Sequence, residues 1–169
     1  MARVFLSLGS NLGDRRGNLE AALALLRAEL EVRVVTCSQV YETTPWPPLG
    51  SPRETWHLNC AVELETDLPP DRLLELTQAI EGQSGRTPAP GPPGPPGPRT
   101  LDIDILLYAD QVIAEDHLQI PHPFLHQRRF VLVPLADIAP EVEHPTLYQS
   151  IVDLLGELPG EDDVVPYPD

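Results

Sequence analysis

Proline sets the limits within which this chain can fold. The sequence has 21 prolines among its 169 residues, with four of them between Thr44 and Pro52 and seven between Pro88 and Pro98. Because proline lacks a backbone N–H and has a fixed φ, neither segment can join a β-ladder or continue a helix. Both segments are therefore predicted to be loops. The second resembles collagen, but its two or three Gly-Pro-Pro triplets cannot sustain a triple helix, and a stiff, extended loop is expected.

Outside these loops, the spacing of apolar residues predicts a defined order of strands and helices. Apolar or alternating runs predict strands at residues 4–8, 32–41, 58–65 and 100–108. Helical spacing predicts one helix over residues 19–30 and a second that begins at Pro69–Asp71 and ends near Gly85. This order is the βαββαβ pattern of a ferredoxin-like α+β sandwich. We expect a mainly antiparallel sheet with helices on one face, which leaves the other face for a site.

The remaining segments add short elements to this single domain. Short helical pieces are expected around Phe130–Leu132 and over Ile151–Leu155. The domain is expected to span residues 1–159, and residues 160–169 are expected to form a loose, acidic tail.

The charge balance excludes several classes of partner. The chain has 26 acidic and 11 basic residues, all of the latter arginine, for a net charge of −15. Such a surface disfavours unspecific binding to nucleic acid or to anionic membranes. The N-terminal apolar run is too short for a signal peptide, and no stretch approaches the roughly 18 apolar residues of a membrane span. Cys37 and Cys60 lack metal-ligand spacing and are expected to be free thiols in the reducing cytoplasm.

The sequence Asp102-Ile103-Asp104 is the sharpest candidate for chemistry. On a strand, residues i and i+2 point to the same face, so both carboxylates project together while Ile103 faces the other way. Two carboxylates this close repel one another unless a cation lies between them. Oxygen ligands of this kind suit Mg²⁺, whose coordination is usually completed by waters and substrate phosphates. The alternative is a polar strand face in water, although so apolar a strand gives little reason for two aspartates in register.

Four arginines flank this motif and are candidates for contacts with phosphate: Arg86, Arg99, Arg128 and Arg129. A chain without lysine must bind phosphate through guanidinium groups, which offer planar, bidentate donors. Taken singly, each arginine is more simply explained as a solvated surface charge. Their clustering around one metal-type motif favours the interpretation as phosphate contacts.

Three further polar residues are candidates for the same site. Gln78 and Glu81 are three residues apart on the second predicted helix and share a face, directed either toward solvent or toward a nucleotide. His122 lies between two prolines and is therefore held on a rigid turn, either as a surface residue or as a contact to phosphate.

Residues on and near the third predicted strand could bind an aromatic heterocycle. Asn59 has the paired donor and acceptor that read a base-like ring. Phe130 and His57 could sandwich such a ring, although core packing explains Phe130 equally well. The sequence has no GxxxxGK[ST] loop, no kinase glycine-rich loop and no GxSxG elbow.

At the fourth predicted strand the motif becomes recognisable. The run Gly97–Leu106, GPRTLDIDIL, closely resembles the signature of the 6-hydroxymethyl-7,8-dihydropterin pyrophosphokinases, a family of the folate pathway. The resemblance covers roughly residues 4–158. Its further pieces follow in family order: Leu8–Gly13, Tyr41–Thr43, Leu58–Asn59, Gln78–Glu81, Gly85–Arg86, Pro121–Pro123, Arg128 and Phe130–Leu132.

This resemblance implies an activity and small-molecule partners. A pyrophosphoryl group would pass from ATP to the hydroxymethyl group of the pterin, with release of AMP, on a monomeric enzyme. Asp102 and Asp104 would hold two Mg²⁺ ions that bridge the triphosphate and the substrate hydroxyl. Arg86 and Arg99 would complete the catalytic set.

The resemblance also assigns binding roles to the other candidates. The matching positions are Arg86, Arg99, His122 and Arg128 for phosphate, Gln78, Glu81 and Ile105 for the nucleotide, and Thr43, His57, Asn59, Phe130 and Asp102 for the pterin. Within the pterin set, Thr43 would contribute backbone contacts, and His57 stands where the family has a stacking aromatic residue.

Two segments depart from the family pattern. Pro88 stands where the family usually has a second arginine after Arg86, and Pro95 and Pro96 replace a basic residue and a tryptophan. Trp46–Pro48 is inserted in the earlier loop. The loop after Arg86 closes over the active site in relatives, and here it has lost the usual basic residues. Two alternatives stay open. One is another Mg²⁺-dependent nucleotidyl or phosphoryl transferase, and the other is a non-catalytic domain that binds a nucleotide or pterin.

Overall fold

The computed structural model describes residues 1–44, 56–84, 100–160 and 164–168. Most of both proline-rich segments, with Arg86 and Arg99, lies outside the described residues, so the loops predicted there are not described. The elements are β1 (Ala2–Ser10), α1 (Arg15–Ala28), β2 (Val32–Cys37), β3 (Tyr41–Thr43), β4 (His57–Thr66), α2 (Pro70–Gln83), β5 (Asp102–Tyr108), β6 (Ile113–Glu115), β7 (Leu118–Ile120), the 3-10 turn η2 (Leu125–Gln127), α3 (Arg129–Ile138), α4 (Ile151–Gly156) and β8 (Val164–Pro166).

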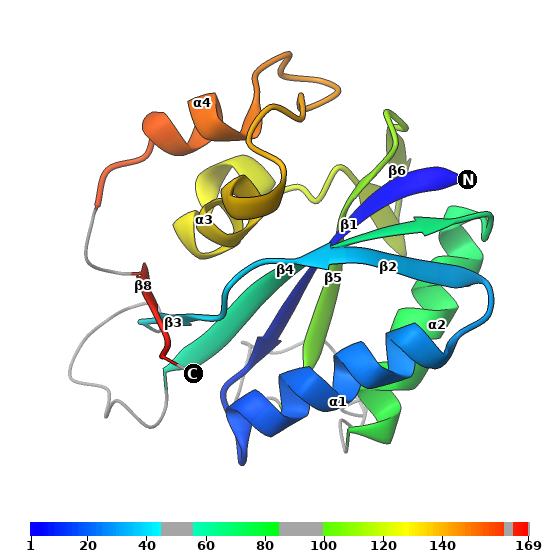
Figure 1. Ribbon diagram of the computed structural model, residues 1–169. Coiled ribbons are helices and arrows are strands. Elements are labelled where there is room, and N and C mark those ends of the chain that lie inside the picture. The colour runs from blue at the N-terminus through cyan, green and yellow to red at the C-terminus, as the bar shows by residue number, and fades with distance from the viewer. Residues whose placement is uncertain (45–55, 85–99, 161–163, 169) are drawn as a thin grey trace.

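The main sheet is antiparallel and has the strand order β5-β1-β4-β3-β8, with β2 also paired to β4 (Figure 1). The predicted ferredoxin-like α+β fold is confirmed by this arrangement. The single strand expected at residues 32–41 is in fact two strands. β2 pairs with the half of β4 from Val62 to Thr66, and β3 pairs with the first three residues of β4, His57–Asn59.

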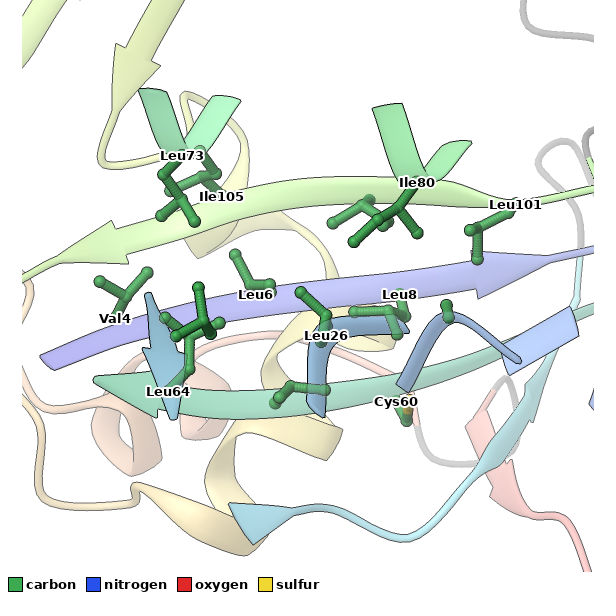
Figure 2. Packing of buried hydrophobic residues seen from close by; sticks show 14 of the residues in the cluster. Val4, Leu6, Leu8, Leu26, Cys60, Leu64, Leu73, Ile80, Leu101 and Ile105 are labelled. Atoms are coloured by element: carbon green, nitrogen blue, oxygen red, sulfur yellow. The ribbon is translucent and has the colours of Figure 1, made fainter. Parts of the chain in front are cut away.

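Helices cover both faces of this sheet. Alternate residues of β1 serve two cores, as the two-residue period of a strand requires. Val4, Leu6 and Leu8 pack with α1 and α2 (Figure 2), whereas Phe5 packs with residues of α3 and α4. The expectation of helices on one face therefore holds for α1 and α2 only, since α3 and α4 lie against the opposite face (Figure 1).

The end of the chain differs from the loose tail expected over residues 160–169. Val164–Pro166 forms β8, which runs antiparallel to β3. Val164 is buried, and the N–H of Tyr167 donates to the carbonyl of Val40 at 2.8 Å. The described residues 164–168 therefore belong to the sheet, and β8 rather than β3 is its last strand.

The start of α1 connects three parts of the chain. The carboxylate of Asp14 accepts the N–H of Gly17 at 3.1 Å and so caps the helix. Arg15, the first helical residue, donates from Nη1 to Glu42 Oε2 at 3.1 Å and to the carbonyl of Trp56 at 2.7 Å. Because Glu42 is only 2% exposed, this is a buried ion pair between α1 and β3.

Both cysteines are free thiols in the structure. Cys60 is buried, and its burial raises the pKa of the thiol to about 12. Cys37 is half-buried, and burial raises its pKa as well. In the part of the chain that the structure describes, a helix with the length and apolarity needed to cross a membrane does not occur.

A buried histidine stabilises the connection between α3 and α4. His144 is 4% exposed, and its Nδ1 accepts the backbone N–H groups of Thr146 at 3.3 Å and Leu147 at 3.2 Å. An Nδ1 that accepts cannot carry a proton, so this turn requires the neutral ring. Burial, and then the neighbouring His126, lower the pKa of His144 accordingly.

The free energy of unfolding is therefore expected to fall as the pH drops below about 6.5, the pKa of an unfolded histidine. In that range the unfolded chain binds a proton at His144 that the folded chain does not, so acid favours unfolding. Urea denaturation at pH 7.5 and 5.5 measures the loss. The variant His144→Gln should lose less on acidification than the parent, and an equal loss in both proteins would contradict the assignment.

Candidate active site

Asp102 and Asp104 lie on β5, the first strand in the order of the sheet. Both side chains are partly exposed, whereas Leu101, Ile103 and Ile105 are buried. The pair therefore projects from the α3 face while the residues between point into the core under α1 and α2. In the register of the sheet, Asp102 lies opposite Gly9 and Asp104 opposite Ser7 of β1.

A row of polar side chains continues from Asp102 across the sheet. Asn59 of β4 lies opposite Gly9 on the other side of β1. A Cβ at Gly9 would come within 2.7 Å of Asn59 Oδ1, so only glycine leaves room for this side chain. Asn59 Nδ2 in turn donates to Thr43 Oγ1 of β3 at 2.8 Å, and both residues are buried. Asp102, Asn59 and Thr43 thus come together from three strands.

His57 lies at the beginning of β4, beside this row. It is opposite Thr43 in the register and half-buried. Its Nε2 is 3.4 Å from Nδ2 of Asn11, the residue that follows β1. The structure therefore brings His57 to the same end of the sheet as Asn59 and Thr43.

His122 reaches the aspartates from the turn that follows β7. Its N–H donates to the carbonyl of Leu106 on β5 at 3.0 Å, and its Nε2 is 3.9 Å from Asp104 Oδ2. Burial and then the Arg128 cation lower the pKa of His122 to about 4, against an opposing effect of Asp102. The ring is therefore neutral at pH 7. Its Nδ1 accepts the N–H of Phe124 at 3.2 Å, so the proton is on Nε2, the nitrogen nearer Asp104.

Arg128 provides a cation beside this turn. Its guanidinium carbon lies 5.0 Å from the centre of the Phe124 ring and 5.6 Å from that of Phe130. Contacts with both aromatic faces fix the position of the charge, because the ring quadrupole attracts a cation. Phe130 is half-buried. The structure therefore gives Phe130, in the first turn of α3, a contact with Arg128 in addition to its packing in the core on this face of the sheet.

A pocket of about 210 Å³ opens on the outer side of β5. It is lined by Leu74, Ile103, Asp104, Ile105, Asp116, His117, Leu118, Gln119, His122 and Pro123. Three of the residues predicted from the sequence, Asp104, Ile105 and His122, therefore share one cavity. The wall from Asp116 to Gln119 belongs to the β6–β7 hairpin, which the sequence reasoning missed. The sequence pattern that indicates this hairpin is the alternation of Leu118, Gln119 and Ile120. Three residues are too few to distinguish a strand from a loop.

The two predicted residues of α2 lie in different environments. Gln78 is exposed and does not line the pocket. Glu81 is 7% exposed, and its Oε2 accepts the N–H of Ile103 at 2.8 Å. The expectation that the two share a solvent-facing side is therefore wrong for Glu81, whose carboxylate binds the backbone of the strand that carries Asp102 and Asp104.

The donor set fits a magnesium site that is completed by other molecules. Asp102 and Asp104 offer carboxylate oxygens on one face of one strand, which are the ligands that Mg²⁺ prefers. A search of the described residues for three or more ligand side chains with donor atoms close together finds Asp71, Glu115 and His117, which are all exposed. Asp102 and Asp104 do not belong to that group. Two protein carboxylates leave coordination positions for water and phosphate, as is usual for Mg²⁺.

Comparison with known proteins identifies the class of protein to which this chain belongs. A family profile described as 7,8-dihydro-6-hydroxymethylpterin-pyrophosphokinase (HPPK) matches residues 5–140. A 2-amino-4-hydroxy-6-hydroxymethyldihydropteridine pyrophosphokinase of Bacillus subtilis is 45% identical over 139 residues, which are 82% of this chain and 79% of that protein. The protein of the same name from Porphyromonas gingivalis is 45% identical over 146 residues, 86% of this chain and 95% of that one.

The fold is shared with solved structures as well. The wild-type HPPK-DHPS protein of Plasmodium falciparum superposes with a TM-score of 0.71 at 18% identity. The match covers 92% of this chain and 44% of that one, so this chain spans less than half of the longer protein. At this identity the likeness concerns the fold alone.

Fold and matches together define the class, an α+β pyrophosphokinase domain. The chain belongs to the 7,8-dihydro-6-hydroxymethylpterin-pyrophosphokinase family, as its sequence motifs predicted. It is a pyrophosphokinase of folate biosynthesis.

Proposed function

We propose that the chain is a diphosphotransferase that uses ATP and Mg²⁺ at the Asp102–Asp104 pair. The oxygen of the pterin hydroxymethyl group attacks the β-phosphorus of ATP, and the bond from that phosphorus to the α–β bridging oxygen breaks. AMP leaves with the bridging oxygen, and the alcohol proton is released to water. The product is the pterin diphosphate.

The observation that supports this proposal is that Asp102 and Asp104 lie between two different surfaces, a row of polar side chains and a pocket. On one side, the polar row of Asn59 and Thr43 begins across Gly9 from Asp102. On the other, Asp104 lines the pocket beside α2 and the β6–β7 hairpin. A transfer between two substrates needs the reacting groups to meet in a fixed geometry, and a carboxylate pair at the junction meets that need.

The two surfaces suggest which substrate each one binds. Asn59 offers the donor and acceptor pattern that a heterocycle needs, and Thr43 and His57 lie beside it at the same end of the sheet. Phe130 is assigned to the pterin by the family resemblance. The pocket, with Ile105 and Leu74, supplies apolar contacts for the nucleotide base, while Gln78 and Glu81 are assigned to the nucleotide by family resemblance.

The phosphates of ATP would then lie along the cations and donors between these surfaces. His122 Nε2 is 3.9 Å from Asp104 Oδ2, and Arg128 is close enough to His122 to lower the pKa of its ring. Arg86 and Arg99 are assigned to the phosphates by their positions in the family motifs. Bound at Asp102 and Asp104, two Mg²⁺ ions would neutralise phosphate charge and lower the pKa of the attacking hydroxyl. The protein groups position the reactants, and this is the main requirement of phosphoryl transfer.

The test is incubation of the purified chain with ATP, Mg²⁺ and hydroxymethyldihydropterin, followed by separation of the nucleotides. AMP is the expected product, formed in equal amount with the pterin diphosphate, and omission of Mg²⁺ should abolish it. Release of ADP or pyrophosphate would indicate a different phosphoryl or nucleotidyl transferase. Binding of both ligands without turnover would indicate a non-catalytic domain. Either result contradicts the proposal.

We further propose that residues 1–159 contain the catalytic groups and that the enzyme acts as a monomer in the cytoplasm. The free thiols of Cys37 and Cys60 support a reducing compartment. The acidic surface supports small-molecule partners rather than nucleic acid or membrane. Sedimentation velocity of the full chain measures its oligomeric state.

A further inference from the structure

The last described segment covers the edge of the sheet beside the proposed pterin site. We name residues 164–168 the strap. Its strand β8 pairs with β3, with Val164 opposite Thr43 and Pro166 opposite Tyr41. Strand β3 has only three residues and lies between β4 and β8. The strap therefore lies along the strand that carries Thr43.

Tyr167 anchors the strap to α1. Its N–H donates to the carbonyl of Val40 at 2.8 Å. The guanidinium carbons of Arg15 and Arg16 each lie 5.7 Å from the centre of its ring. Arg16 also donates from Nη1 to the carbonyl of Pro168 at 2.9 Å. The strap is thus held by a backbone bond, two cation–π contacts and a side-chain hydrogen bond.

Arg15 connects this anchor to the proposed pterin site. The guanidinium that contacts Tyr167 also binds Glu42 of β3 and the carbonyl of Trp56, the residue before β4. Glu42 precedes Thr43, and Trp56 precedes His57 in the sequence. A side chain of the strap therefore packs on the group that fixes the positions of both strands.

We propose that the strap is a positioning element for the pterin side of the site, with Tyr167 as its positioning residue. It holds β3 in place, so that Thr43 accepts from Asn59 and Asn59 stays over Gly9. This inference rests on the assignment of Asn59 and Thr43 to the pterin. The pocket beside Asp104 is lined by residues of α2, β5, the β6–β7 hairpin and the turn at His122. The strap contributes no residue to that lining, so we expect it to affect the binding of the pterin and not that of ATP.

The experiment compares three full-length variants in steady-state kinetics with ATP, Mg²⁺ and hydroxymethyldihydropterin. Tyr167→Ala should raise the KM for the pterin about tenfold, the factor that corresponds to the loss of two cation–π contacts. The KM for ATP and kcat should change less than about twofold. Tyr167→Phe keeps the ring and should restore the parent KM. Tyr148→Ala removes a tyrosine that is 75% exposed elsewhere and should leave all constants unchanged.

A second measurement does not depend on activity. Amide hydrogen exchange over Tyr41–Thr43 should be faster in Tyr167→Ala than in the parent and in Tyr167→Phe. The protein should remain folded, since the hydroxyl of Tyr41 still ties β3 to Asp137 of α3 at 2.6 Å. Unchanged exchange would contradict the proposal that the strap holds β3 in place, even if the enzyme transfers pyrophosphate as proposed. Faster exchange with equal changes in the KM values for ATP and for the pterin would contradict the proposal that the strap affects only the pterin side of the site. Failure of the parent to form AMP would overturn the proposed function, while the exchange result would still decide whether the strap holds β3.

Discussion

Asp104→Asn is expected to lower kcat by at least about a thousandfold, because the amide removes one of the two charges that would hold Mg²⁺ at the junction of the two substrate surfaces. The fold should persist, since the side chain of Asp104 is 36% exposed and the substitution preserves its shape. AMP formation measures kcat, and urea denaturation measures the free energy of unfolding.

The matched control for this variant is Asp110→Asn, which neutralises an exposed aspartate shortly after β5. It should retain parental kcat and stability. If Asp104→Asn turned over ATP at a near-normal rate, the assignment of the metal to this pair would be wrong. Calorimetric titration of the apoprotein with Mg²⁺ and a non-hydrolysable ATP analogue separates lost metal binding from a lost catalytic step.

Arg15→Met should lower the free energy of unfolding by about 3 kcal/mol. The side chain of Glu42 is 3% exposed and that of Arg15 is 15% exposed. Removal of the guanidinium therefore takes this cation away from a buried carboxylate, which costs more than the loss of an exposed contact does. Urea denaturation at pH 7.5 measures the change.

A surface ion pair provides the control for Arg15. Arg72 pairs with Glu75 on α2 at 3.2 Å, and both side chains are 66% exposed. Arg72→Met should cause no measurable loss, because solvent screens exposed pairs. The double variant Arg15→Met, Glu42→Met should be more stable than Arg15→Met alone, since it removes the buried carboxylate together with the cation that Arg15 supplied. A loss in Arg15→Met no larger than that in Arg72→Met would contradict the buried-pair interpretation.

The two-residue and 3.6-residue spacings of apolar side chains predicted most of the fold. Alternation identified the strands, including the common face of Asp102 and Asp104, and helical spacing identified α1 and α2. Proline made two of the remaining elements hard to predict. Pro134 lies within α3, where a proline normally argues against a helix, so that only a short piece was expected there. In the same way, Pro166 and the acidic residues around it concealed β8.

The environment of the candidate site could be predicted only in part. Residue type and spacing singled out Asn59 and His122, because their chemistry is local. The partner of Glu81 is Ile103, which is 22 positions away, and no periodicity predicts such a contact. The pocket wall from Asp116 to Gln119 likewise depends on the packing of a hairpin against β5. Arg86 and Arg99 lie outside the described residues, so their roles stay predictions.

The hydrogen bonds along β5 have a consequence for how this enzyme avoids aggregation. A strand at the boundary of a sheet presents unpaired N–H and C=O groups that can recruit a strand from another molecule. β5 must keep Asp102 and Asp104 accessible at such a boundary. Glu81 accepts from the N–H of Ile103, and the N–H of His122 donates to the carbonyl of Leu106. The chain thus occupies these two pairing positions with its own groups, so Asp102 and Asp104 stay partly exposed on this strand while the strand is a poor template for another chain.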